Sequence, residues 1–343
     1  MGPIMNFINN FGYFLVCLFG AIFILNGLGN TLLGEPLEVS IVIMFLTTSK
    51  QFSRPINEIA QLYSSLITAL AGAERVFVVM DEDIESFEGD IKMPENEVKG
   101  NIEFSHVKFG YNPEVPILKD FSAVVPAGNK IALVGETGSG KTTIVNLLLR
   151  YYDLDEGFIK IDGKDILNIS KKDLRDSVSI VLQDPVLFCD TIENNIRYGK
   201  SDAPDEEIDF ALELANCKQF VDLLPDGKKT VLVEGATNIS QGQRQLLTIA
   251  RAILADPKIL ILDEATSSVD TRTEKKIQEA MIKLMENRTS IIIAHRLSTI
   301  QDSNNIIVLD SGMVKEQGNH KELLEKNGIY KRLYETQFKG LET

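Results

Sequence analysis

A run of glycines and hydroxyl-bearing residues at positions 135 to 142 has the types and spacing needed to hold a polyphosphate. It fits the pattern G-x-x-x-x-G-K-[ST]. Glycines let backbone N–H groups close around phosphates, Lys141 adds a positive charge, and the Thr142 hydroxyl can reach a bridging Mg²⁺ ion. The sequence therefore predicts a site for ATP and Mg²⁺, made by Gly135, Glu136, Thr137, Gly138, Ser139, Gly140, Lys141, Thr142 and Thr143.

The segments flanking this loop favour a nucleotide site over a solvated glycine-rich turn, which the bare pattern also allows. Lys130 to Val134 is a short apolar run typical of a buried strand, and Thr143 to Tyr151 is predicted to be helical. A phosphate-binding loop connects such a strand to such a helix.

A second apolar run, Ile259 to Leu262, ends in the acidic pair Asp263 and Glu264. Ligands of open α/β sheets bind at the carboxyl ends of parallel strands, so we expect this pair beside the loop. There Asp263 would hold Mg²⁺ through water, and Glu264 would orient or deprotonate the water that attacks the γ-phosphate. An acid pair after a strand is also a common helix N-cap, and the loop favours the catalytic interpretation.

The segment Asn238 to Gln245 opens a predicted helix, and Ser240 and Gln243 have the spacing of a capping box. A helix start that carries a serine hydroxyl and a glycine, here Gly242, is also an anion site. Both capping and the binding of a phosphate presented by another subunit stay open for these residues.

Length and composition restrict the class of protein. A chain of 343 residues with 44% hydrophobic content is expected to hold more than one domain, or a domain with an appendage. A formal net charge of −14 argues against nucleic acid as a partner, which would need clustered Lys and Arg. Three widely spaced cysteines indicate neither a disulfide framework nor a zinc site.

The first 80 residues have the pattern of a membrane region. The first basic residue is Lys50, and Phe11 to Leu33 is almost continuously apolar, long enough to cross a bilayer core of about 30 Å. Residues 37–80 are predicted to form a second spanning helix with a cytosolic extension. The alternatives to the first span are a buried helix of a soluble protein and a cleaved signal peptide. A signal peptide is disfavoured because the sequence has no basic n-region. Lys50, Arg54 and Arg75 place the downstream region in the cytoplasm.

An acidic linker over residues 81–97 is expected to lead into a domain covering 98–343. That domain alternates strand-like and helical runs, which is typical of an α/β sheet with an added antiparallel part. The expected strands are 102–109, 131–134, 158–161, 259–262, 290–294 and 306–309, and the expected helices are 205–216, 243–255 and 271–286.

In this order the motifs resemble the ATPase of ABC transporters, from residue 98 to about 338. The resemblance implies a P-loop NTPase fold with antiparallel β and helical subdomains. It assigns Tyr111 to the aromatic residue that stacks on adenine, Gln183 to the loop glutamine that reaches Mg²⁺, and His295 to the switch histidine that contacts the γ-phosphate. Residues 267–270 are similar to the D-loop, which adds Asp270 to the expected nucleotide-binding residues.

Residues upstream resemble the last two membrane helices of an ABC exporter, through the turn at Gly34, the pair Arg54-Pro55 and the segment 73–77. Glu234 is similar to the exporter-type acid that senses the membrane domain. Exporter halves carry further helices before these two, so the sequence is similar to the C-terminal part of such a half.

One departure concerns the family signature Leu-Ser-Gly-Gly-Gln, in which Ile239 and Gln241 here replace Leu and the first Gly. Beside an intact Glu264, this signature resembles the catalytically complete half of heterodimeric bacterial multidrug exporters. The expected activity is ATP hydrolysis that powers export of a drug, lipid or peptide across the cell membrane, with a second half-transporter as partner in a heterodimer or a homodimer. A nucleotide-gated binding module and a soluble ABC-type ATPase are the alternatives.

Overall fold

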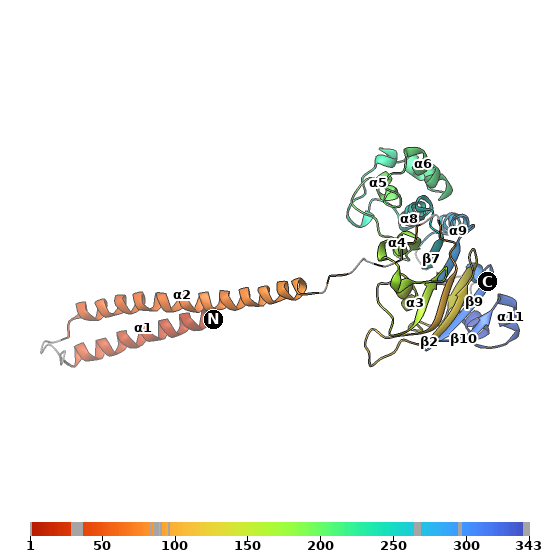
Figure 1. The fold of residues 1–343 in the computed structure, drawn as a ribbon. Helices are drawn as coiled ribbons and strands as arrows, with labels where there is room; N and C mark the ends of the chain where they lie inside the picture. Colours follow the sequence, from red (N-terminus) through yellow and green to blue (C-terminus); the bar gives the residue numbers. More distant parts are fainter. Residues whose placement is uncertain are drawn as a thin grey trace. The chain divides into compact units, whose positions relative to one another are not determined.

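The computed structural model describes residues 2–28, 37–82, 84–85, 89, 91–94, 97–263, 269–293 and 297–338. For residues 2–6, 52–53, 56–57, 60, 297–298 and 337–338 it describes the backbone only. The chain divides into two compact units, Met1–Glu85 and Ser86–Thr343 (Figure 1). Each unit is described separately below.

The first unit is a pair of helices, α1 (Gly2–Leu25) and α2 (Val39–Met80), that pack against each other. A Schellman motif ends α1: Gly27 has a φ of 63°, Gly27 N donates to Ile24 O, and Leu28 N donates to Phe23 O. The helix thus ends before Leu33, the expected limit, because Asn26 and Gly27 provide a C-cap. Residues 29–33 of the expected span lie outside the described part of the chain.

Two stretches of these helices are long and apolar enough to cross a membrane. They are Phe7–Leu25 in α1 and Gln61–Met80 in α2. They do not lie side by side, because Gly20 packs against Val42 and Tyr13 packs against Lys50. The part of α2 that pairs with the α1 stretch therefore precedes Gln61.

The second unit is built on a mixed sheet. Within the described residues the sheet has ten strands in the order β5-β4-β1-β2-β10-β9-β3-β8-β7-β6. The strands are β1 (Ile102–Phe109), β2 (Leu118–Val125), β3 (Lys130–Val134), β4 (Glu156–Ile161), β5 (Lys164–Asp165), β6 (Val178–Val181), β7 (Ile259–Asp263), β8 (Thr289–Ile293), β9 (Asn305–Asp310) and β10 (Met313–Gly318). Strands β9, β3, β8, β7 and β6 run parallel, whereas β1 pairs antiparallel with β2 and β4.

Helices cover both faces of the parallel part of this sheet. Alternate residues of β3 face opposite sides: Ile131 and Leu133 join the buried cluster that contains α3, while Ala132 and Val134 join the cluster that contains α8 and α9. The helices are α3 (Lys141–Leu148), α4 (Lys171–Asp176), α5 (Ile192–Arg197), α6 (Asp205–Leu214), α7 (Lys218–Asp222), α8 (Gln241–Ala255), α9 (Thr271–Met285), α10 (Leu297–Gln301), α11 (His320–Glu325) and α12 (Ile329–Leu333), with short turns η2 (Ile166–Asn168), η3 (Gly227–Lys229), η4 (Glu234–Ala236) and η5 (Tyr334–Phe338).

This arrangement confirms the predicted α/β fold with antiparallel and helical additions. The antiparallel strands gather at one edge of the sheet, and α5, α6 and α8 gather near the other (Figure 1). The parallel strands β3, β8, β7 and β6 lie next to one another, so the loops that follow them share one edge of the sheet.

The later part of the acidic segment 81–97 is packed on the second unit. Ile91 N donates to Asn168 O at 2.9 Å, Met93 N donates to the Asp173 carboxylate at 3.1 Å, and Met93 is 3% exposed. The segment was expected to be hydrated because of its charge. Its apolar residue Met93 is buried instead, and so is Val98, which directly follows the segment.

Candidate functional site

The loop between β3 and α3 is held by backbone contacts that require glycine. A Cβ atom at Gly135 would lie 2.3 Å from Leu309 O, on the neighbouring strand β9. Gly140, the residue before α3, has a φ of 106°, a left-handed conformation that favours glycine. The glycines therefore fix the path of the loop between the end of β3 and the start of α3.

Lys141 lies inside this loop. It is 8% exposed, and its Nζ donates to Gly135 O at 2.7 Å and to Glu136 O at 2.9 Å. Burial lowers the pKa of its ammonium group, and the carboxylate of Asp263 acts in the opposite direction. The cation is thus held within the loop and close enough to the end of β7 to interact with Asp263.

The loop also contains a buried hydroxyl group with no partner. Ser139 Oγ is shielded from solvent and has no hydrogen-bond partner among the described residues, although a buried polar group normally has one. Gly138 has a φ of 83°, and a Cβ there would meet no other atom within 4 Å, so this side of the loop is open. A donor set of backbone N–H groups, a buried ammonium and an unpaired hydroxyl fits a bound anion such as a phosphate.

The other predicted loop residues differ in their exposure to solvent. Glu136, Thr137 and Thr142 are exposed, whereas Thr143 is 5% exposed. Thr142 lies in the first turn of α3, where an exposed hydroxyl can be a metal ligand.

Neighbouring parallel strands bring further predicted residues to the same edge of the sheet. Asp263 ends β7 and pairs with Ile293 at the end of β8, which in turn pairs with Leu133 of β3. Gln183 is exposed and follows β6, whose Val181 pairs with Leu262. The structure thus groups the loop, Asp263 and Gln183. Glu264 and His295, which follow β7 and β8 in the sequence, lie outside the described residues.

Predicted metal ligands come from three elements: Thr142 from α3, Asp263 from β7 and Gln183 from the segment after β6. The described residues contain no group of three or more His, Cys, Asp and Glu side chains that could hold a metal ion by themselves. A set of one carboxylate, one hydroxyl and one amide fits Mg²⁺, which takes few protein ligands and completes its shell with phosphates and water.

Tyr111 is linked to the helix that follows the loop. Its hydroxyl accepts a hydrogen bond from Asn146 Nδ2 at 3.1 Å, and Asn146 belongs to α3. Its ring lies edge-on to Phe109 and to Tyr152, with centroids 5.1 and 4.9 Å away. The ring remains 49% exposed, so an aromatic face is available for a planar base. Tyr152, which sequence reasoning missed, completes this aromatic group.

At the start of α8, the signature residues Ser240 and Gln243 form the predicted capping box. Ser240 Oγ accepts a hydrogen bond from Gln243 N at 3.3 Å, and Gln243 Oε1 accepts one from Ser240 N at 2.9 Å. A Cβ at Gly242 would lie 2.4 Å from the Thr273 side chain, so glycine allows α8 to approach α9. Asp270 caps α9 by accepting from Thr273 N at 3.0 Å, which lowers the pKa of its carboxyl group. Among the described residues, none of these contacts involves the loop at 135–142.

Two polar residues of α8 that sequence reasoning missed connect this helix to the segment after β6. Gln245 is 5% exposed and donates through Nε2 to Leu182 O at 3.3 Å, next to Gln183. Arg251 donates to Val186 O at 3.0 Å, to Asn195 O at 2.8 Å and to Asn195 Oδ1 at 3.1 Å. The sequence signal was available, because both are polar residues within the apolar run of a buried helix.

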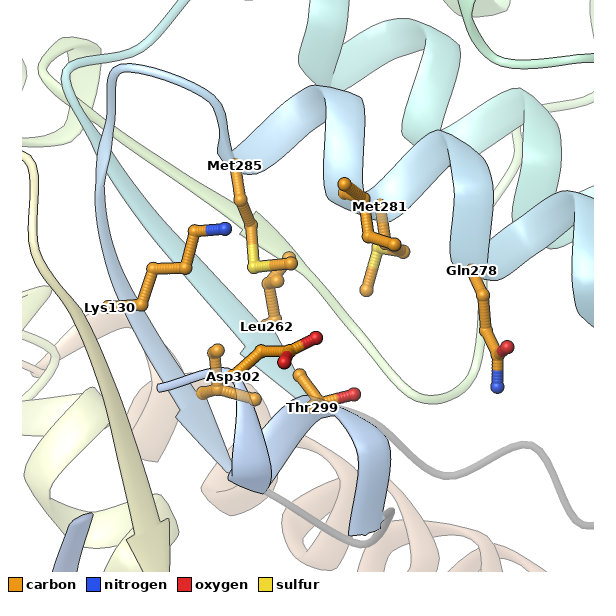
Figure 2. Close-up of a pocket in the computed structure, with 9 residues that line it drawn as sticks. Lys130, Leu262, Gln278, Met281, Met285, Thr299 and Asp302 are labelled. Atoms are coloured by element: carbon orange, nitrogen blue, oxygen red, sulfur yellow. The ribbon is translucent and has the colours of Figure 1, made fainter. Parts of the chain in front are cut away.

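A cavity of about 200 Å³ lies elsewhere, between α9, α10 and the sheet. Figure 2 shows Met281 and Met285 of α9 facing Leu262, with Thr299 and Asp302 on the other side. None of the predicted nucleotide-site residues is among its described lining residues, which are mostly apolar. This cavity is therefore separate from the predicted nucleotide-site residues.

Comparison with known proteins agrees with this geometry. Residues 118–267 match the sequence profile of the family described as ABC transporter. A fatty acid ABC transporter ATP-binding/permease protein of Mycobacterium bovis is 45% identical over 328 residues, covering 96% of this chain and 50% of the relative. An ATP-dependent lipid A-core flippase of Legionella pneumophila is 46% identical over 287 residues, covering 84% of this chain and 48% of the relative.

A solved structure of a bacterial Atm1-family ABC exporter with ATP bound is also similar. It matches with a TM-score of 0.69 and 36% sequence identity over 97% of this chain and 58% of that chain. The chain spans about half the length of the curated relatives it matches. The chain therefore carries an ABC transporter ATPase domain and belongs to that family.

Proposed function

We propose that this chain hydrolyses ATP to power export across a membrane, as one half of a dimeric ABC exporter. The observation that carries the proposal is the loop at 135–142, in which the buried Lys141 ammonium and the unpaired Ser139 hydroxyl lie together. Both are donors suited to the β- and γ-phosphates. Tyr111 would stack on the adenine base from its position beside α3.

In this proposal the hydrolytic residues act by positioning and by charge. Thr142, Asp263 and Gln183 would hold Mg²⁺, which neutralises charge on the phosphates. Glu264, directly after Asp263 in the sequence, would orient the attacking water, and His295 would contact the γ-phosphate. Thr143, Glu136 and Thr137 would complete the loop around the phosphates.

A second ATPase domain would complete the site with its own signature helix. We propose that Ser240, Gly242, Gln243 and Asp270 serve the nucleotide bound by the partner chain, whether a second copy or a related half-transporter. The exposed position of Ser240 at the start of α8 supports this, because a helix N-terminus attracts an anion.

We further propose that α1 and α2 lie in the cell membrane with the ATPase domain in the cytoplasm, and that the exported substrate is a lipid-like amphiphile. The apolar length of α1 supports the first point. The names of two relatives, one for fatty acid and one for lipid A-core, support an amphiphile over a peptide or a polar drug.

The Glu264→Gln variant tests the hydrolytic part. Removing the carboxylate while keeping the shape should lower ATP turnover by at least about a hundredfold and leave ATP affinity within about twofold, because the base acts only in the chemical step. ATP binding is measured by equilibrium dialysis and turnover by phosphate release, both with the chain in lipid nanodiscs.

Glu325→Gln, an exposed acid on α11, is the matched control and should change neither quantity. Undiminished turnover in Glu264→Gln would remove this residue from the catalytic role. Tight ATP binding without turnover in the unmodified chain, even with a partner half present, would favour a nucleotide-gated binding module.

A further inference from the structure

The cavity between α9, α10 and the sheet has an apolar floor and a polar rim (Figure 2). Its floor is made by four side chains that are at most 6% exposed: Leu262, Met281, Met285 and Ile292. The rest of the described lining is more exposed to solvent and consists of Lys130, Gln278, Ile282, Thr299 and Asp302. An apolar recess with a few polar groups directed at it is the usual form of a small-molecule site.

The size of the cavity restricts its occupant to a small molecule. Its volume is about 200 Å³, whereas pockets for drug-sized ligands measure about 300 to 1,000 Å³. A dry apolar cavity of roughly 150 Å³ is large enough to bind benzene. Methionine sulfur atoms make favourable contacts with aromatic rings, and two methionines of α9, Met281 and Met285, line this cavity. The cavity therefore fits one substituted aromatic ring.

Asp302 gives the cavity a hydrogen-bond acceptor. In Figure 2 its side chain reaches from the end of α10 toward Leu262. Its carboxylate has no hydrogen bond or ion pair with any other residue that the structure describes. An ionised carboxylate only accepts, so the occupant must supply an O–H or N–H donor. The described lining holds one ammonium, that of Lys130, and one carboxylate, so the charges balance and a neutral occupant is favoured.

The cavity lies between two helices that follow predicted nucleotide-site residues. Helix α9 begins at Thr271, directly after Asp270, and α10 begins at Leu297, two residues after His295. Residues of both helices line the cavity, so an occupant touches both at once and its affinity depends on their separation. Because such coupling is reciprocal, a bound molecule favours one separation of α9 and α10.

We propose that this cavity is a regulatory site for a small neutral aromatic molecule with one O–H or N–H donor, of which phenol is the simplest example. The ring lies between Leu262 and the two methionines, and the donor bonds the Asp302 carboxylate. The binding site is independent of the nucleotide. Its effect on turnover rests on the proposed ATPase function.

The test observes the methionines directly. The chain has eight methionines, so ¹³C labelling of their methyl groups gives few signals, and Met281→Leu and Met285→Leu variants identify the two that matter. Phenol or anisole is titrated into the chain in lipid nanodiscs, without ATP. We expect saturable shifts of these two signals, with phenol binding about tenfold more tightly than anisole, a methyl ether that cannot donate a hydrogen bond.

Met93 is an internal control, because it is buried in the other apolar cluster and does not line the cavity. Its signal should stay in place. Equal shifts of Met93 would mean that phenol dissolves throughout the protein and would overturn the proposal, as would equal affinities for phenol and anisole.

Asp302→Leu should bring the ratio of the two affinities close to one. Glu286→Gln, an exposed acid next to Met285 that does not line the cavity, should leave the ratio unchanged. A ratio that survives in Asp302→Leu would contradict the assigned hydrogen bond. An unchanged Met93 signal and unchanged circular dichroism verify that each variant is folded.

The regulatory role is tested by ATP turnover with and without saturating phenol. Turnover of the unmodified chain should fall at least about twofold, because the occupant holds α9 and α10 at one separation. Asp302→Leu at the same phenol concentration should lose less, which separates this effect from any effect on the lipid. Unchanged turnover with saturated methionine signals would overturn the regulatory role. The binding titration contains no ATP, so failure of this site and failure of the ATPase proposal can be told apart.

Discussion

Lys141 is a residue whose proposed binding role lowers the stability of the folded protein. Its ammonium group is buried, and burial lowers its pKa below the ordinary value of 10.5. Two loop carbonyl groups accept its hydrogen bonds, and Asp263 offsets part of the desolvation. A charge held in this way destabilises the fold, and such strain is common where a site must bind an anion.

We therefore expect Lys141→Met to lose ATP binding and to gain thermal stability by about 2 to 4 °C, the shift for a gain of roughly 1 kcal/mol in a domain of this size. Between the folded pKa and 10.5 the unfolded chain holds more protons, so the stability of the unmodified protein rises with pH there. The difference between variant and unmodified protein should therefore narrow as pH rises toward 10.5. Calorimetric unfolding at several pH values measures it.

Lys130→Met is the control, since this lysine begins β3, the strand before the loop. It should keep ATP binding. A Lys141→Met protein less stable than the unmodified chain at neutral pH would show that the two carbonyl contacts outweigh the buried charge.

At the residue scale, the sequence allows prediction of site residues that are close together in the chain. The loop at 135–142 was predictable because its glycines, Lys141 and Thr142 follow one another, and the fixed spacing implies the geometry. The hydrogen bond from Gln245 to Leu182 and the contact of Tyr152 with Tyr111 join residues far apart in the chain. A polar residue in an apolar helical run marks Gln245, but no local pattern predicts such pairings, so the partners needed the structure.

Among the elements, α8 and the segment after β6 are joined by hydrogen bonds from Gln245 and Arg251. Arg251 makes three hydrogen bonds to Val186 and Asn195, and its guanidinium lies 5.6 Å from the ring centroids of both Phe188 and Tyr198. Gln245 adds a contact at Leu182. These contacts physically connect the segment that contains Gln183 to the helix capped by Ser240, and so join the two predicted functional regions.

Arg251→Gln should weaken the contact between α8 and the segment after β6. We expect the free energy of unfolding to fall by about 2 kcal/mol, because Asn195 is buried and would lose a charged partner. Hydrogen exchange should rise in residues 184–198 and leave the core strand β3 protected. Mass spectrometry after exchange measures both regions in one experiment.

Arg272→Gln, an exposed arginine in the first turn of α9, should leave the exchange pattern unchanged. Faster exchange throughout the sheet in Arg251→Gln would mean that the whole domain loosens. That result would contradict a local connection.

The sequence predicted the buried elements better than the exposed ones. Strands β3 and β7 are continuous apolar runs, and their positions agree with expectation to within a residue. Strand β2 was not predicted, because one of its faces is exposed and its polar residues Lys119, Asp120 and Ser122 hide the alternation. The short helices α4, α5 and α7 were also missed, since pieces of five or six residues show no full period.

At the scale of the whole molecule, the proposed nucleotide site is divided between two chains. In the described part of one chain, Ser240 and Gln243 bond each other and Gly242 packs against Thr273, with no contact to the loop at 135–142. In the proposed function, the signature helix that faces this loop comes from the second chain. If that chain is a second copy, a two-fold axis makes both sites equivalent.

Ser240→Asp isolates the binding role of this residue. Aspartate is as good an N-cap as serine, so α8 should stay intact, while its negative charge would repel a triphosphate. We expect turnover to fall at least about tenfold. Ser240→Asn keeps the cap without the charge, and it should retain both the helix and most of the turnover.

Mixing two inactive variants then decides between a homodimer and a heterodimer. Lys141→Met disables the loop and Ser240→Asp disables the signature, so each variant alone should keep at most about a tenth of the unmodified turnover. When the two are unfolded from their dimers and reassembled together, half of random dimers contain one copy of each and have one intact site. Turnover should then return to about a quarter of the unmodified level if the chain pairs with itself. No recovery, with mixed dimers verified by mass spectrometry, would show that the site is not shared between two copies, and the partner would have to be a different half-transporter.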